Sequence, residues 1–287
     1  ATDTLIEDSY STMSGVMAGL AIRTIGGSVV RSHTTGNTTT AGLVNYASGT
    51  LFANDYATGD VANTTFTAAG GLVATYATSS TAGSSNKIVD SFATGDVSGS
   101  VPIGGLVGTQ SGSVVALDVT NSYATGDVTG SYSSAVQTVF GIGGLIGYSN
   151  YVHVTRSHAS GNVTSDANVG YVGGLVGYMN GGNASTMSTI ANSYATGNVV
   201  SNGTPMSFNS AGGLVGNMSY TNIANSYATG NVTGYNVVGG LVGAANNSQI
   251  SGSYTSGLIT ATKGMGLNTS VGGIVGNGYS LGIDNSY

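Results

Sequence analysis

Apolar and polar positions follow one another along this chain in a pattern whose core unit is about 23 residues. The pattern centres on ten aromatic residues, and the fourth residue before each of them is apolar. These apolar residues are Ile6, Val29, Phe52, Ile88, Val119, Val154, Ile190, Ile223, Ile250 and Ile283. A second apolar position follows the aromatic by five residues in seven repeats, from Val61 to Ile259. Positions that stay apolar in this way are expected to face the interior.

The two inward positions lie nine residues apart and so have opposite parity, which a single continuous strand cannot provide. A turn or bulge must separate them, and the Asn-Ser pair before the aromatic is the natural place because Asn tolerates left-handed conformations. Counting back by twos from the second apolar position places the Gly and Ala inward and the aromatic, Thr and Asp or Asn outward. We favour this interpretation. The rival interpretation buries the aromatic residues as an interior stack.

A second motif, GGLVG, alternates with the aromatic one. It occurs at residues 104–108, 173–177, 212–216 and 239–243, with Ile variants at 143–147 and 272–276. From its third position to the next aromatic is 13 residues in six of nine repeats, and extra residues enter at only two places in the unit. Insertions confined to fixed points are typical of loops on a repeating scaffold.

Units rich in Gly, Thr, Val and Tyr, without runs of helix-favouring residues, favour strands over helices. The sequence therefore predicts an all-β fold, a parallel β-solenoid (β-helix) of about nine to ten coils with three short strands per coil, stacked about 4.8 Å apart. One continuous domain covers residues 1–287.

Stacking in register brings like residues into columns, whose ring stacks and hydroxyl ladders stabilise the rod. The aromatic column is Tyr10, His33, Tyr56, Phe92, Tyr123, His158, Tyr194, Tyr227, Tyr254 and Tyr287. The threonine column is Thr12, Thr35, Thr58, Thr94, Thr125, Ser160, Thr196, Thr229 and Ser256. The Asx column is Asn37, Asp60, Asp96, Asp127, Asn162, Asn198 and Asn231.

Composition narrows the class of protein. Gly supplies 49 of 287 residues, charged residues only 6%, Pro 2 and Cys 0. Collagen, which needs Gly at every third position and abundant Pro, is excluded, as is a disulfide-stapled module. A net charge of -6 with five basic residues argues against nucleic-acid binding. No apolar run approaches the roughly 20 residues of a membrane helix, so we expect no transmembrane segment.

The alternation of GGLVG with I-x-N-S-Y-A-T-G-D/N-V closely resembles the GLUG motif. That motif recurs in large bacterial surface and secreted proteins, including filamentous-haemagglutinin-like adhesins and non-catalytic regions of some immunoglobulin A peptidases. The resemblance extends from Ile6 to Tyr287, although Ala18 and Ala41 replace the first Gly in the first two repeats. It implies a repetitive extracellular stalk or adhesive segment at the cell surface, and it offers no catalytic residues.

Catalysis is not expected, because Cys is absent and no GxSxG nucleophile elbow occurs. Three successive carboxylates of the Asx column, Asp60, Asp96 and Asp127, would repel one another unless a hard cation such as Ca²⁺ bridged them. Alternatively, these carboxylates point into water at a turn. His33 and His158 simply take the place of Tyr in the aromatic column. Arg31 and Arg156 lie two residues before these His residues, a pairing for which the sequence offers no account.

The outward columns are the best candidates for binding. The candidate residues are Tyr56, Tyr123, Tyr194, Tyr227, Tyr254, Thr58, Thr94, Thr125, Thr196 and Thr229. Such a face could stack on sugar rings of cell-surface glycans, or pack against another rod. The alternative is that the columns only stabilise the stack. A regular array of Thr also suggests ice as a ligand. This hypothesis is disfavoured because paired T-x-T columns are absent. A polysaccharide-cleaving enzyme is disfavoured by the sparse carboxylates.

The favoured hypothesis is a non-enzymatic, extracellular structural or adhesive module that forms a rod, stalk, fibre or sheath. Residues 1–5 approximate the continuation expected after Tyr287, so joining the ends would nearly restore the repeat. Two interpretations follow. The chain is flanked by neighbouring repeats of a longer chain, or copies associate with one another end to end or laterally.

Overall fold

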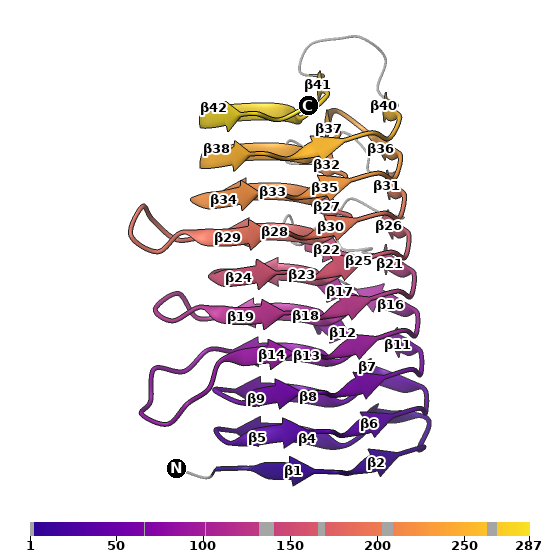
Figure 1. The fold of residues 1–287 in the computed structure, drawn as a ribbon. Helices are drawn as coiled ribbons and strands as arrows, with labels where there is room; N and C mark the ends of the chain where they lie inside the picture. Colours follow the sequence, from indigo (N-terminus) through magenta and orange to yellow (C-terminus); the bar gives the residue numbers. More distant parts are fainter. Residues whose placement is uncertain are drawn as a thin grey trace.

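The computed structural model describes residues 3–65, 67–100, 102–131, 141–165, 170–202, 209–262 and 269–287. In these residues the chain winds into a stack of coils, and the strands of successive coils pair in parallel (Figure 1). The coils climb from the N-terminal end to the C-terminal end along one axis (Figure 1). The expected all-β parallel solenoid is confirmed.

The strands belong to three sheets, A, B and C. Sheet A holds β1 (Leu5–Glu7), β4 (Ala21–Ile25), β5 (Ser28–Val30), β8 (Val44–Ser48), β9 (Leu51–Ala53), β13 (Val73–Ala77), β14 (Lys87–Val89), β18 (Val107–Ser111), β19 (Leu117–Thr120), β23 (Ile146–Ser149), β24 (Val152–Thr155), β28 (Val176–Asn180), β29 (Ser188–Ala191), β33 (Val215–Ser219), β34 (Thr221–Ala224), β38 (Val242–Ser251) and β42 (Val275–Asp284).

Sheet B holds β2 (Tyr10–Ser11), β6 (His33–Thr34), β10 (Tyr56–Ala57), β15 (Phe92–Ala93), β20 (Tyr123–Ala124), β25 (His158–Ala159), β30 (Tyr194–Ala195), β35 (Tyr227–Ala228) and β39 (Tyr254–Thr255). Sheet C holds β3 (Val16–Ala18), β7 (Thr38–Ala41), β11 (Val61–Asn63), β12 (Ala69–Gly70), β16 (Val97–Ser100), β17 (Ile103–Gly104), β21 (Val128–Ser131), β22 (Gly141–Gly143), β26 (Val163–Ser165), β27 (Tyr171–Gly173), β31 (Val199–Ser201), β32 (Ser210–Gly212), β36 (Val232–Gly234), β37 (Val237–Gly239), β40 (Ile259–Ala261) and β41 (Ser270–Gly272).

A typical coil carries five short strands rather than the expected three, for example β10, β11, β12, β13 and β14. Sheets A and C each receive two strands from such a coil, because turns interrupt the chain between them. In β38 and β42 the two strands of sheet A merge into one strand of ten residues. The count differs from the expectation because the sequence marks the insertions but not every corner.

The register between coils pairs like residues with like. Tyr194 pairs with Tyr227, and Val128 pairs with Val163. At the apolar position before the aromatic, Ile88 pairs with Val119. The predicted columns are therefore real features of the fold.

The predicted left-handed turn lies two residues before each aromatic. Here φ is between 46° and 57° at Asp8, Arg31, Asn54, Asp90, Asn121, Arg156, Asn192, Asn225, Gly252 and Asn285. Asn and Asp hold most of these positions, because their side chains tolerate the left-handed conformation. The turn reverses side-chain parity, so the apolar residue four before the aromatic and the apolar residue five after it both point inward.

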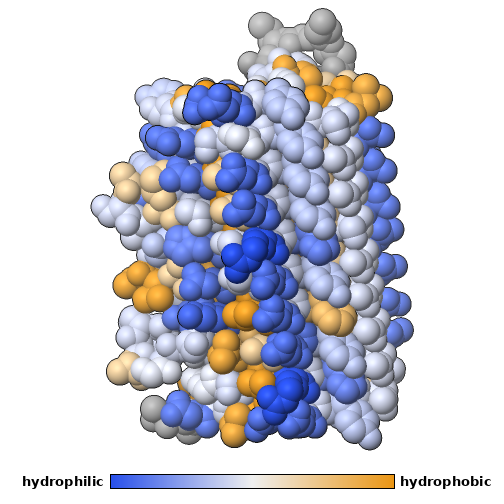
Figure 2. Space-filling model, viewed as in Figure 1, coloured by the Kyte–Doolittle hydropathy of each residue, from blue (hydrophilic) through white to orange (hydrophobic). Residues whose placement is uncertain are grey.

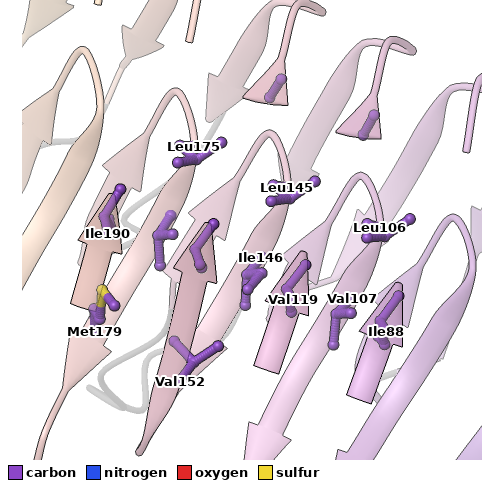
Figure 3. Close-up of a cluster of buried hydrophobic side chains, with 14 of the residues drawn as sticks. Ile88, Leu106, Val107, Val119, Leu145, Ile146, Val152, Leu175, Met179 and Ile190 are labelled. Atoms are coloured by element: carbon purple, nitrogen blue, oxygen red, sulfur yellow. The ribbon is translucent and has the colours of Figure 1, made fainter. Parts of the chain in front are cut away.

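Two large apolar clusters of described residues form most of the core, and a third holds only Ala18, Ala41 and Ala74. The larger lies between the facing strands of sheet A and under sheet B, and Figure 3 shows Val107 and Ile146 opposite Val119 and Val152. The smaller lies between the facing strands of sheet C, where Val128 packs with Ile142. The expected inward positions from Val29 to Ile250 are all buried, whereas Ile283 in the last coil is 49% exposed.

The GGLVG motif requires glycine because no space is left for a side chain, and not because the backbone has a positive φ. A Cβ at Gly105 would lie 2.1 Å from the carbonyl oxygen of Gly144 in the next coil. The Gly of the aromatic motif is equally tight, since a Cβ at Gly95 would lie 2.1 Å from the oxygen of Gly59. Backbones of neighbouring coils therefore touch directly at both motifs, and no larger residue fits without moving a coil.

Replacing Gly174 by Ala is expected to lower the free energy of unfolding by about 3 kcal/mol. Its Cβ would lie 2.1 Å from the oxygen of Gly213 and 2.9 Å from the Cβ of Ala195. Gly273 holds the same motif position in the last coil and has nothing within 4 Å of a Cβ. Gly273→Ala is therefore the matched control, with an expected change within about 0.5 kcal/mol. Equal losses for both variants in chemical denaturation would contradict the steric explanation.

Candidate functional site

The aromatic column lies on the outside of the rod, as the favoured interpretation predicts. Figure 2 shows the rings as a continuous row that runs along the stack of coils. The members from His33 to Tyr254 are half-buried, because each ring packs between its neighbours. Ring centroids are 4.5–5.6 Å apart and ring planes differ by at most 15°.

This geometry determines what the column offers to a ligand. Rings stacked in parallel cover one another's faces, so solvent meets their edges and, for Tyr, the hydroxyls. Only the end rings have a free neighbouring position, and Tyr10 and Tyr287 are 71% and 79% exposed. A sugar that stacks on an aromatic face therefore has no such face available along the inner part of the column.

The threonine column runs beside the aromatic column. Thr58, Thr125, Thr196 and Thr229 are exposed and Thr94 is half-buried. Their backbone N–H groups donate to carbonyls of the preceding coil, as Thr196 does to Ala159 at 3.0 Å. The hydroxyls thus form an outward row that the backbone ladder holds in position.

The Asx column has a structural role that the sequence did not reveal. Each side-chain oxygen accepts a hydrogen bond from the backbone N–H of the next column member. Oδ1 of Asp60 accepts from Asp96 at 3.0 Å, Oδ1 of Asp96 from Asp127 at 2.8 Å, and Oδ1 of Asp127 from Asn162 at 2.7 Å. Because Asp and Asn both present this oxygen, either residue can occupy a position in the column.

The calcium expectation for Asp60, Asp96 and Asp127 gains no support from this arrangement. Within the described ranges no group of three or more His, Cys, Asp or Glu side chains is placed to hold a metal ion. One oxygen of each carboxylate already accepts a backbone N–H, and the column is exposed, so water screens the repulsion between neighbours. The calcium site at these three residues therefore remains a prediction from the sequence.

A serine column, one residue before each aromatic, was missed at the sequence level. Its members are Ser9, Ser32, Asp55, Ser91, Ser122, Ser157, Ser193, Ser226, Ser253 and Ser286. Each Ser Oγ from Ser91 onward accepts the N–H of the preceding member at 3.1–3.2 Å. It also donates to the carbonyl two residues earlier, as Ser226 does to Ala224 at 2.8 Å. The recurrence of Ser at this position, in every repeat but the one with Asp55, was the available signal.

Asp55 replaces Ser in this column and is fully buried. Its Oδ1 accepts the N–H of Ser32 at 2.8 Å, and its Oδ2 accepts the N–H of Ala53 at 3.0 Å. Burial raises the pKa of this carboxyl to about 7, and the two backbone donors act in the opposite direction. Asp55 is thus a buried acid at the centre of a structural ladder.

Arg31 and Arg156 reach back to the preceding coil, where each bonds a polar side chain. The guanidinium of Arg31 bonds Asp8 at 2.7 Å and also Glu7. Arg156 donates to Oδ1 of Asn121 at 2.8 Å. Both Arg residues occupy left-handed positions, and their partners Asp8 and Asn121 occupy the same position one coil earlier. The Arg side chains therefore continue a polar ladder.

The histidines divide between two settings. His33 and His158 stack within the aromatic column, and burial lowers the pKa of His158 below its ordinary value. His153 lies on sheet A, where its Nδ1 bonds the hydroxyl of Thr189 at 2.9 Å and its ring meets Tyr151 edge-on. None of these contacts brings a base to an activated nucleophile with a third orienting group.

Stacked parallel coils, ladders repeated from coil to coil and an apolar interior define a β-solenoid repeat protein. The GLUG motif is found at residues 209–233, which contain Tyr227, Ser226 and the Gly-Gly turn of one coil. The other coils place residues of the same kind at these positions, so the match supports a GLUG-repeat protein. No curated protein matches the chain significantly. Among the described residues, no helix is long and apolar enough to cross a membrane.

The buried carboxyl of Asp55 is expected to make stability depend on pH. Its folded pKa of about 7 lies above the ordinary 3.8, so the unfolded chain releases this proton first. The free energy of unfolding should therefore fall as pH rises from about 4 to about 7, by on the order of 2–4 kcal/mol. Asp55→Asn should remove this part of the profile in denaturant titrations at several pH values. Asp55→Ser, which restores the column residue, is the second control, and unchanged profiles in both variants would contradict the assignment.

Asp96→Asn is expected to raise the free energy of unfolding by a few tenths to about 1 kcal/mol, and less at high salt. Asn keeps the acceptor for the Asp127 N–H and removes a charge between Asp60 and Asp127. Asp96→Ala loses the acceptor and should cost about 1 kcal/mol. Melting temperatures with Ca²⁺ and with a chelator should coincide. A calcium-dependent rise in the wild type that Asp96→Asn abolishes would establish the ion site instead.

Proposed function

We propose that this chain is a non-enzymatic structural module of an extracellular or cell-surface rod, stalk, fibre or sheath. The observation that carries the proposal is that side chains of the repeated columns contact their counterparts in neighbouring coils of the same rod. The aromatic, serine and Asx columns each bond or stack from coil to coil. A molecule organised in this way is elongated, and each coil is held by contacts with its neighbours.

Association through coil stacking is the second element of the proposal. Apart from Val114, the exposed large apolar side chains lie in the first and last coils of the described chain. They are Leu5, Tyr10, Met13, Met17, Ile22, Ile25, Leu258, Val271, Tyr279, Ile283 and Tyr287. Of these residues, Val271 and Ile283 continue core columns whose members in the preceding coil, Val238 and Ile250, are buried. We propose that a coil of the same kind covers each end, from neighbouring repeats of a longer chain or from another copy.

The alternative function, a carbohydrate-binding face on the Tyr and Thr columns, is less well supported by the geometry. Stacked neighbours cover the ring faces of Tyr123, Tyr194 and Tyr227, which leaves ring edges and hydroxyls. Glycan contact would then rest on the hydroxyl row alone, and adhesion would use that row or the loops. Ice binding has no additional observation in its favour.

The experiment compares the wild type with Ile283→Asp by light scattering and negative-stain electron microscopy at rising concentration. We expect the wild type to form lengthwise assemblies and Ile283→Asp to resist them, because a charge in the open core column opposes stacking. Val114→Asp is the matched control, since Val114 is equally apolar and 79% exposed but lies in a loop between β18 and β19. This control should assemble like the wild type.

A wild type that stays monomeric at every concentration would contradict association through the ends. A glycan array with the same samples tests the alternative function, and we expect no binding. Glycan binding that Tyr194→Ala or Tyr227→Ala abolishes while the fold persists would overturn the structural proposal in favour of a sugar-binding face.

A further inference from the structure

The aromatic column changes character in its last coils. Up to His158, each Tyr has only His or Phe as its neighbour in the column. From Tyr194 onward, four tyrosines follow one another. Their centroids are 4.9 Å, 5.0 Å and 5.5 Å apart, with ring planes within 12° of parallel. Only this part of the column stacks phenol directly on phenol.

We propose that Tyr194, Tyr227 and Tyr254 form an oxidative cross-linking site, at which a peroxide acting through a haem peroxidase or a photosensitiser joins phenols of adjacent coils as dityrosine. This inference does not rest on the proposed function.

The chemistry balances with one peroxide per cross-link. Each phenol loses its hydroxyl hydrogen as one electron and one proton, which gives two phenoxyl radicals. The radicals join through ring carbons ortho to the oxygens, forming one carbon–carbon bond. Each ring then returns its ortho hydrogen to its own oxygen through solvent and regains aromaticity. The two electrons and two protons removed reduce hydrogen peroxide to two molecules of water.

The backbone register holds the partners in place before any oxidation. Tyr194 pairs with Tyr227 and Tyr227 with Tyr254 as Cα partners in sheet B, so the two rings of a pair cannot drift apart without opening a coil. Parallel rings bring an ortho carbon of one phenol over the face of the next, which is the approach that radical coupling needs. Holding two reactants in this way raises their effective concentration strongly.

The side chains of the three tyrosines are partly open to reagents. Burial raises the pKa of Tyr227, and the neighbouring Tyr194 and Tyr254 add to this rise, as expected when phenol oxygens lie side by side. All three rings are half-buried, so their edges meet solvent while their faces stay in the stack. A small oxidant can therefore remove electrons at the edge, and water can carry the protons away.

The product would lock the coils of β30, β35 and β39 together. A bond between Tyr194 and Tyr227 spans one full coil, and a bond between Tyr227 and Tyr254 spans the next. A covalent link of this kind restricts the unfolded chain in the same manner as a disulfide. A chain without Cys would thereby gain a cross-link in an oxidising environment.

The test oxidises dilute wild-type protein by light with tris(bipyridine)ruthenium(II) and persulfate, reagents small enough to need no docking. Persulfate accepts the two electrons and becomes two sulfates. We expect dityrosine fluorescence, loss of two hydrogen atoms per link in the intact mass, and cross-linked peptides that join Tyr194 to Tyr227 or Tyr227 to Tyr254. The product should remain monomeric on a denaturing gel and should melt at a higher temperature than the untreated protein.

Two double variants provide the comparison. The first combines Tyr227→Phe with Tyr254→Phe and keeps a ring at each position, as Phe92 does naturally. Tyr194 then has no phenol next to it in the column. Tyr56→Phe with Tyr123→Phe removes the same number of phenols, none of which neighbours another in the column. We expect the first variant to lose the mapped cross-links at least tenfold and the second to retain them.

Coupling elsewhere is separated by peptide mapping, because Tyr148 and Tyr178 also stack, at 4.8 Å, on sheet A. Absence of both predicted links in oxidised wild type would overturn the proposal, whether or not the variants fold. Equal cross-linking of the column in both double variants would overturn it as well, since the link would then come from other tyrosines.

Discussion

The hydrogen-bonded register between successive coils is the constraint on which the rest of this structure depends. It places each outward side chain directly beside its counterpart in the next coil, as with Tyr194 and Tyr227 or Thr129 and Thr164. A residue type therefore suits a position only when it can neighbour itself at about 4.8 Å. Aromatic rings, hydroxyls and amides meet this condition, whereas like charges repel and recur in register only where water screens them, as at Asp60, Asp96 and Asp127. The low charge of the chain follows from the stacking.

The same register leaves backbone N–H groups at the turns that no carbonyl reaches, and such groups must be paired when buried. The serine and Asx columns provide the acceptors. Ser193 Oγ accepts the N–H of Ser157, and Asn162 Oδ1 accepts the N–H of Asn198. At Asp55 a carboxyl supplies the acceptors in place of the Ser hydroxyl. Burial removes water from this carboxyl and raises its pKa.

Much of this fold could be predicted from the sequence, because the repeat itself records it. The inward apolar positions, the left-handed turn before the aromatic and the outward ring column all follow from period and parity. The acceptor roles of Ser and Asx could not be predicted in the same way, since their bonds join residues 23–36 apart, such as Asn37 and Asp60 or Ser122 and Ser157. Nothing local in the chain indicates which atom lies in the next coil.

The partners of Arg31 and Arg156 illustrate the same limit. Each Arg bonds the residue at its own position one coil earlier, and that residue lies 23 positions before Arg31 but 35 before Arg156. Residues added to the sequence of the coil account for the difference in spacing. Sequence distance therefore gives no constant rule for these contacts, whereas position within the coil does.

Stacking also decides what the outer surface can do. A column that presents ring faces would suit sugars, but rings in register give their faces to each other and leave edges to solvent. The contacts that stabilise the rod thus consume the surface that a stacking ligand would use. Chemistry that needs neighbouring phenols, or a partner that offers another coil, remains compatible with such a surface. The arrangement of the rings therefore argues against a ligand that stacks on ring faces along the inner part of the column.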